Sequence, residues 1–201
     1  MPHPEPARPT LAGHLFVLLL HLLPHHLLGR LAHLLTRSEW PPLKDRLIRQ
    51  AIARFRVDLS TAAEPDPSAY PSFNAFFTRA LQAGARPIDP AAEAIGCPAD
   101  GEISEAGVVA DGRLVQAKGW HYTLFELLGG DARLAAELDG GPYATIYLSP
   151  RDYHRVHMPF RGRLRRMIHV PGRLYSVNHL ATATLPRLFA RNERVISVFD
   201  T

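Results

Sequence analysis

The chain changes character at Pro87, and this change limits the folds that it can adopt. Before Pro87, apolar side chains recur every three or four residues; after it, short alternating runs are separated by glycines. The first pattern is typical of amphipathic helices and the second of half-buried strands. We therefore predict an α+β fold, with helices first and a mostly antiparallel β domain after them. The turn-rich connector that begins at Ser60 divides the chain into a leader with helices, residues 1–60, and the remainder, residues 61–201.

The composition is that of a folded globular chain. Of the 201 residues, 46% are hydrophobic and 21% charged, a balance that excludes a disordered acidic tail, a collagen-like repeat and a disulfide scaffold. A single cysteine, Cys97, excludes an internal disulfide and a CxxC redox pair. A reduced, cytoplasm-facing compartment is the natural inference.

The N-terminal segment is rich in leucine and histidine but is interrupted. Its longest apolar stretch, Leu15–Leu20, is followed by His21 and Pro24. A spanning helix needs about 20 mostly apolar residues, so we expect two short helices, joined near Pro24, that do not cross a membrane. A third, basic and amphipathic helix is predicted from Pro41 to about Val57. This order is typical of an interfacial membrane segment; the alternative is that the helices only cap a core.

The rest of the chain contains turn signals and short strands. Ser72 is a candidate N-cap of a short helix, whose aromatic stripe we expect to pack in a core. Val108–Val115 is predicted as a hairpin with an Asp-Gly turn. Further strands are expected at 144–148, 164–170 and 195–199.

Two histidines three residues apart, His154 and His157, lie between Pro150 and Pro159. Histidine exchanges protons near neutral pH, and the prolines restrict the local backbone. The alternative is a surface turn with two solvated side chains. A metal site is also conceivable, but it is weaker because alternation along a strand would send residues three apart to opposite faces.

A second candidate segment contains Cys97 and Asp100. An acid before a glycine is most often only a turn, but Asp100 gains interest if it orients one of the histidines, as in a catalytic triad. Cys97 could be a nucleophile, although its apolar neighbours and Pro98 favour a packed thiol.

A third cluster is basic. Ten arginines occur from Arg151 to Arg194, against the two acids Asp152 and Glu193. Such a run suits an anionic lipid surface or nucleic acid. No recognition element for nucleic acid accompanies it, so we expect no nucleic-acid partner.

Several of these segments together resemble the bacterial phosphatidylserine decarboxylase family. The most specific is Tyr147-Leu148-Ser149-Pro150-Arg151-Asp152-Tyr153-His154-Arg155-Val156-His157-Met158-Pro159. The other matching segments are Phe73–Phe77, Arg86–Asp89, Pro98–Gly101, Gln116–Gly119, Val170–Asn178 and Leu188–Val195.

The resemblance implies a carboxy-lyase of phospholipid biosynthesis. Such an enzyme converts phosphatidylserine to phosphatidylethanolamine and CO2 through a Schiff base on a self-generated pyruvoyl group, its covalent cofactor. By motif position, Asp100 and His157 match the acid and base that activate a serine for self-cleavage into β and α chains. His154 matches the histidine of the decarboxylation step. The N-terminal helices match a membrane-facing segment at the cytoplasmic side of the inner membrane, where phosphatidylserine and other anionic lipids are the expected partners.

One departure from the family pattern concerns the serine that becomes the pyruvoyl group. None of the eight serines follows a Leu-Gly pair, so we expect that serine and the α chain beyond residue 201. The β domain would then be incomplete at its C-terminus and this chain inactive alone, with no cofactor-binding residue and no metal ligand of its own. The alternatives are a decayed, non-catalytic member that only associates with anionic lipid, and a metal-dependent hydrolase. The sequence does not determine the oligomeric state, and a homo-oligomer is one alternative.

Overall fold

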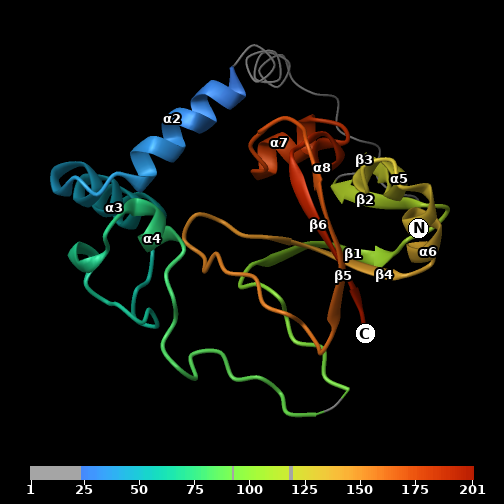
Figure 1. The fold of residues 1–201 in the computed structure, drawn as a ribbon, viewed down its shortest axis with the longest axis horizontal. Helices are drawn as coiled ribbons and strands as arrows, with labels where there is room; N and C mark the ends of the chain where they lie inside the picture. Colours follow the sequence, from blue (N-terminus) through green and yellow to red (C-terminus); the bar gives the residue numbers. More distant parts are fainter. Residues whose placement is uncertain (1–23, 92, 118–119) are drawn as a thin grey trace. The chain divides into compact units, whose positions relative to one another are not determined.

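A computed structural model describes residues 24–91, 93–117 and 120–201 (Figure 1). Its described residues form two compact units, each built from separate stretches of chain. Unit 1 contains residues 24–28, 103–145 and 164–199, and unit 2 contains 29–102, 146–163 and 200–201. Helices precede most of the strands along the chain, which confirms the predicted α+β class.

Unit 2 contains most of the early helices and two long loops. Helix α3 begins at two prolines, whose fixed φ suits the first helical turn, and it ends at Arg56 in the left-handed region, with φ of 55°. Its buried side chains Ile48 and Ala51 pack with Tyr70 and Phe76. The elements are α2 (His25–Arg37), which begins in unit 1, α3 (Pro41–Phe55), the 3-10 helix η1 (Pro67–Ala69) and α4 (Phe73–Phe77).

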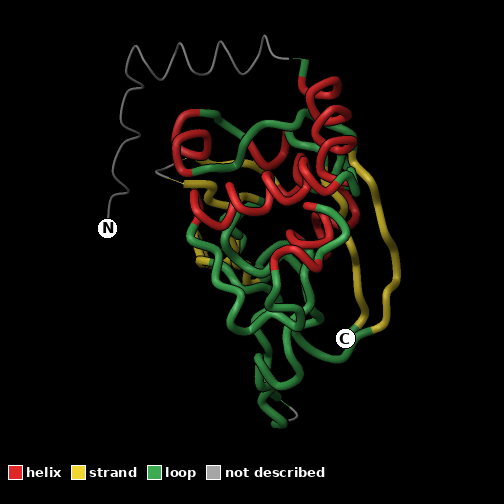
Figure 2. The backbone as a smooth tube through the Cα atoms, turned by 90° about the vertical axis from the view of Figure 1, so that its left-hand side faces the viewer, coloured by secondary structure: helices red, strands yellow, loops and turns green. Residues whose placement is uncertain are grey.

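Helix α4 confirms the predicted cap and stripe. The Ser72 hydroxyl accepts a hydrogen bond from the Ala75 N–H at 3.2 Å, which satisfies one of the open donors of the first turn. Phe76 is 1% exposed and lies in the core of unit 2. Figure 2 shows that much of the chain around these helices is loop.

Among the described residues the strands form three two-stranded sheets, paired β1–β4, β2–β3 and β5–β6, and most of their residues belong to unit 1. Its core is formed by Val109, Leu114, Tyr122, Leu124 and Leu134, among others. The elements are β1 (Glu102–Val108), β2 (Arg113–Ala117), β3 (Trp120–Thr123), α5 (Leu124–Leu127), α6 (Ala132–Leu138), β4 (Pro142–Tyr147), β5 (Arg163–Val170), α7 (His179–Thr184), α8 (Leu188–Arg191) and β6 (Arg194–Asp200). The three strands expected after residue 140 are therefore present.

The predicted hairpin is right about its turn and wrong about its strands. Asp111 and Gly112 both have positive φ, 53° and 67°, and the flanking residues Ala110 and Arg113 form a bridge. Val109, however, exchanges backbone hydrogen bonds with Gly140 and Gly141. Because those donors and acceptors are used there, β1 pairs with β4, and β2 pairs in antiparallel fashion with β3.

The predicted N-terminal helices are only partly within the described residues. The first of the two short helices lies outside them. The second corresponds to α2, which begins directly after Pro24. Within the described ranges, no helix is long and apolar enough to cross a membrane.

Candidate active site

Two loops of unit 2 carry the predicted site residues, and backbone hydrogen bonds join them. The Gly96 N–H donates to the Pro159 carbonyl at 2.7 Å, and the His157 N–H donates to the Pro98 carbonyl at 2.8 Å. A Cβ added to Gly101 would lie 2.5 Å from the Tyr147 carbonyl oxygen, so only glycine permits this close approach. The segment of Asp100 is thereby packed against the segment of the histidines.

His154 is held on two sides. Its Nε2 lies 2.9 Å from the Ser149 carbonyl oxygen, and its ring stacks on Phe77 with the centroids 4.0 Å apart. A carbonyl only accepts, so Nε2 carries the proton and Nδ1 has the lone pair. Burial lowers the pKa of His154 below its ordinary value, partly opposed by the hydrogen bond to Ser149. The ring is thus a neutral imidazole at neutral pH, able to accept a proton at Nδ1.

The turn that presents the Ser149 carbonyl is closed by Asp152. Its carboxylate accepts hydrogen bonds from the Ser149 N–H at 2.6 Å and from the Ser149 hydroxyl at 2.8 Å. Two arginines then fasten the turn to the end of α4: Arg79 donates to the Arg151 carbonyl and Arg155 to the Thr78 carbonyl. These contacts fix the position of His154 relative to Phe77.

His157 has a different environment from His154, although only two residues separate them. Its side chain is exposed, its Nε2 lies 2.9 Å from the Tyr153 hydroxyl, and the two rings stack with centroids 5.5 Å apart. The backbone holds His157 beside Pro98, while its imidazole hydrogen-bonds to Tyr153 and stacks on it. A hydrogen bond to a single hydroxyl leaves this ring available for a further partner.

The Asp100 carboxylate pairs with Arg86. The shortest distance joins Arg86 Nη2 to Asp100 Oδ2 at 2.5 Å, and Nε also donates to Oδ2 at 2.6 Å. No hydrogen bond joins Asp100 to either histidine within the described residues. Asp100, His154 and His157 therefore lie in one compact unit, and the predicted orienting contact of Asp100 stays a prediction.

The expectation of a packed Cys97 thiol is wrong. Cys97 is exposed, and its Sγ donates to the Ala99 carbonyl oxygen at 3.1 Å. The turn before Asp100 directs the chain so that Ala99, and not Cys97, is the buried residue of this segment.

The expected strand at His154 and His157 is wrong, because residues 148–162 form a loop, so strand alternation does not separate these two side chains. Among the described residues, no group of three His, Cys, Asp or Glu side chains is arranged to hold a metal ion.

Several residues of the site were not identified from the sequence. Phe77 and Tyr153 each contact one histidine, Arg86 pairs with Asp100, and Arg79 anchors the turn. The aromatic stripe was assigned to the core as a whole, and Phe77 differs from Phe76 only in its tertiary contact. Arg79 lies between Phe77 and Leu81, and a charged residue within an apolar stripe is the sequence signal that could identify it.

The chain matches known proteins over nearly all of its length. The model of the family described as phosphatidylserine decarboxylase matches residues 73–201, and a second model, described only as PSD, matches 15–56. The phosphatidylserine decarboxylase proenzyme of Azotobacter vinelandii is 56% identical over 187 residues, which is 93% of this chain and 65% of that protein. That of Bordetella avium is 54% identical, over 96% of this chain and 65% of the relative.

A third relative, the proenzyme of Pseudomonas aeruginosa, is 56% identical over 93% of this chain and 65% of its own length. The chain thus spans 65% of the length of these curated relatives. The family match includes both loops of the candidate site, with Asp100, His154 and His157. This chain belongs to the phosphatidylserine decarboxylase family.

Proposed function

We propose that this chain provides catalytic residues of a phosphatidylserine decarboxylase, a carboxy-lyase that converts phosphatidylserine to phosphatidylethanolamine and CO2. The observation that carries the proposal is the joining of the two matched loops, through the hydrogen bond from the His157 N–H to the Pro98 carbonyl. That bond brings the three candidate residues Asp100, His154 and His157 into one unit of the family domain.

His154 is assigned to proton handling in the decarboxylation step. A pyruvoyl group, when present, supplies the electron sink for the loss of CO2. This chain contributes His154 as a neutral imidazole, with its proton on Nε2 and its lone pair on Nδ1. A group whose pKa lies near or below neutrality can accept and return a proton at the working pH, and the stack on Phe77 keeps the ring in place.

His157 and Asp100 are assigned to self-cleavage before a serine. In a triad the acid accepts from Nδ1 of the histidine, and Nε2 takes the proton of the serine. Nε2 of His157 now faces the Tyr153 hydroxyl, a position that a serine hydroxyl could take. Asp100 lies two residues after the carbonyl that holds the His157 backbone, and its carboxylate pairs with Arg86.

The N-terminal helices are assigned to the cytoplasmic surface of the inner membrane as a peripheral contact, with phosphatidylserine and anionic lipids as partners. Helix α2 carries five leucines on one face, 44–68% exposed. Its other face carries histidines and arginines. An amphipathic helix with an exposed apolar stripe can lie in the headgroup region. The leucine stripe is formed by Leu27, Leu28, Leu31, Leu34 and Leu35.

The test is the intact mass of the gene product taken from membranes of the source organism, together with release of CO2 from phosphatidylserine. We expect two chains, the smaller with a pyruvoyl-blocked N-terminus, and CO2 release that depends on both. A single uncleaved chain without CO2 release would overturn the proposal.

The second candidate is a non-catalytic family member that only associates with anionic lipid. The exposed leucine stripe of α2 favours it equally, because such a stripe serves lipid binding with or without catalysis. The same experiment separates the two, since one uncleaved chain that still sediments with vesicles is the result expected for the non-catalytic protein.

A further inference from the structure

A cavity within unit 2 contains a buried arginine whose donors are only partly used. The cavity has a volume of about 210 Å³, and Arg56, Arg79, Arg86 and Arg151 contribute to its wall. Arg79 is only 4% exposed. Its Nε and Nη1 have no hydrogen-bond partner in the part of the chain that the structure describes. Buried donors of a charged group are rarely left unmet, because their desolvation is costly.

The remaining contacts of Arg79 fix its orientation. Its Nη2 donates to the Arg151 carbonyl at 3.1 Å, and its guanidinium carbon lies 5.7 Å from the centroid of the Phe76 ring. Burial lowers the pKa of Arg79, but a guanidinium stays charged at physiological pH. The cavity wall thus includes a fixed positive charge, two of whose donor nitrogens are buried without an acceptor among the described residues.

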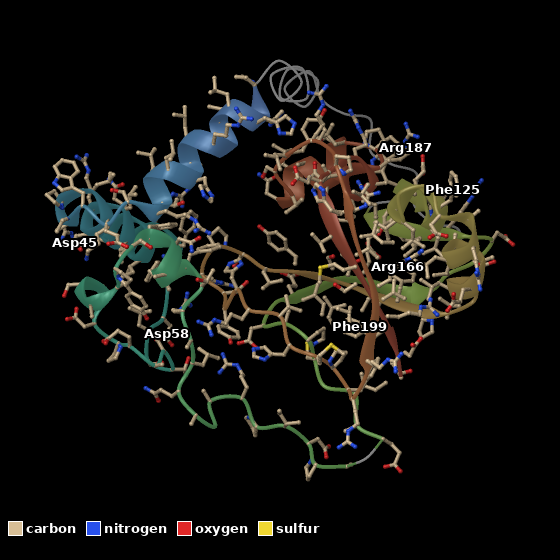
Figure 3. All side chains as sticks on the ribbon, in the orientation of Figure 1. Asp45, Asp58, Phe125, Arg166, Arg187 and Phe199 are labelled. Carbon is tan, nitrogen blue, oxygen red and sulfur yellow. The ribbon has the colours of Figure 1, made fainter. Side chains whose placement is uncertain are left out.

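The carboxylates in the same wall act on this charge only through space: Asp152 and Asp58 partly oppose the lowering of the Arg79 pKa by burial. Asp100 is paired with Arg86, and Asp58 and Asp152 accept hydrogen bonds from serines in their own turns. Figure 3 shows Asp58 on the segment that follows α3. In the described structure no carboxylate oxygen of the three accepts a hydrogen bond from Arg79, whose Nη2 donates also to the Asp152 backbone carbonyl at 3.5 Å. Its Nε and Nη1 therefore have no acceptor among the described residues.

We propose that this cavity is an oxyanion subsite that takes a phosphate group, with Arg79 as the buried donor and Arg56 as an exposed one. A tetrahedral phosphate offers acceptor oxygens in several directions, and arginines on different parts of the wall can therefore bind it together. A phosphodiester of a lipid headgroup and a free phosphate share this chemistry. The assignment to a headgroup rests on the proposed function; the binding of phosphate does not.

The test is isothermal titration calorimetry on the full chain, with inorganic phosphate and with glycerophosphoserine, a soluble headgroup. Arg79→Lys keeps the charge but removes two donors, so we expect binding to weaken about tenfold or more. Arg56→Gln should also weaken it, and because this side chain is exposed the variant should fold. Arg49→Gln is the matched control, since it makes the same charge change on an exposed position of α3 outside the cavity wall.

The outcomes separate the sources of phosphate. Tighter binding of glycerophosphoserine, in competition with phosphate, identifies a headgroup subsite; equal binding identifies a site for the free anion. If neither ligand binds, or if Arg49→Gln weakens binding as much as Arg79→Lys, the proposal is overturned. Circular dichroism checks the fold of Arg79→Lys. If Arg79→Lys is unfolded, the affinity of Arg56→Gln for phosphate decides, and an affinity equal to that of the unmodified chain overturns the proposal.

These results are independent of catalysis. A chain that binds phosphate here and never releases CO2 would retain the subsite and refute the proposed function. A chain that releases CO2 but has no phosphate affinity in this cavity would support the proposed function and refute the subsite.

Discussion

His154 and His157 show how neighbouring residues of one type acquire different chemistry. His154 is half-buried between the Phe77 ring and the Ser149 carbonyl, whereas His157 is exposed and touches a hydroxyl. The contrast comes from the Phe77 ring, which is far from His154 in the sequence. The Ser149 carbonyl and the Tyr153 hydroxyl are only five and four residues from the histidines that they contact. A buried neutral imidazole suits proton transfer, and an exposed one can receive a new partner.

The burial of His154 makes stability depend on pH. Its pKa is lowered below the ordinary value of 6.5, so as the pH falls below 6.5 the unfolded chain takes up this proton more readily than the folded one. The free energy of unfolding should therefore fall as the pH drops from 6.5 through the lowered pKa. Urea titrations at several pH values measure this slope.

His154→Gln should reduce that slope, because glutamine can still donate to Ser149 but has no charge to acquire. His33→Gln, an exposed position on α2, keeps His154 and should keep the slope. An unchanged slope in His154→Gln would show that another group is responsible.

Gly101 is a second residue whose role depends on close contact. An added Cβ would lie 2.5 Å from the Tyr147 carbonyl oxygen and 2.9 Å from Ile146 Cγ2. Gly101→Ala should lower the free energy of unfolding by about 1–3 kcal/mol, the usual range for overpacking. Gly96→Ala is the control, as its Cβ would lie 3.4 Å from the nearest atom, the Pro159 carbonyl oxygen. Equal denaturation midpoints for the two variants would contradict the contact.

At the scale of elements, helix α2 has an apolar face that is largely exposed. Its leucine stripe is exposed, with Leu34 at 68%, while α3 buries its apolar face against Phe76 and Tyr70. Of two consecutive amphipathic helices, α2 thus exposes its apolar face and α3 buries it. The periodicity of a helix shows that an apolar face exists, but not whether protein covers it.

Leu34→Glu should weaken binding of the chain to anionic vesicles roughly tenfold or more, because it removes a leucine from the apolar contact and adds a negative charge. Co-sedimentation with vesicles containing phosphatidylserine measures the loss. His33→Glu adds the same charge on the polar face of α2 and should cause a smaller loss. Equal losses would indicate that charge alone controls binding and that the leucine stripe does not insert.

At the scale of the whole molecule, the ten arginines from Arg151 to Arg194 offer less free positive charge to anionic lipid than their number suggests. In unit 1, Arg166 pairs with Asp131 and Arg187 pairs with Glu126. Both arginines are labelled in Figure 3. The acids come from outside the run, so the local charge excess in the sequence overstates the free positive charge. A surface salt bridge contributes little to stability, but it does reduce the charge offered to lipid.

The proposed roles predict opposite phenotypes in a full-length proenzyme. His157→Ala and Asp100→Ala should leave an uncleaved precursor, because the serine loses its base or the base loses its orienting acid. His154→Ala should allow cleavage but lower the decarboxylation rate at least about 100-fold, the usual contribution of a general acid or base. Gel analysis and CO2 release measure the two steps separately. Normal cleavage of Asp100→Ala would reject its role, and an unchanged rate for His154→Ala would reject that assignment.

The local elements followed from the sequence because local rules control them. Proline starts α3 and Ser72 caps α4. Asp111 and Gly112 form the turn at positive φ that was expected of this pair. In the same way, the specific segment around His154 and His157 identified the family. These features depend on residues a few positions apart, so one sequence contains the information.

What the tertiary structure decided are the partners of those elements. It paired β1 with β4, because Val109 bonds to Gly140 and Gly141. It placed Phe77 against His154 and left two donors of Arg79 without an acceptor among the described residues. Each of these outcomes depends on which distant groups compete for the same donor, acceptor or apolar surface. Periodicity and spacing along one chain do not contain that competition, and only packing resolves it.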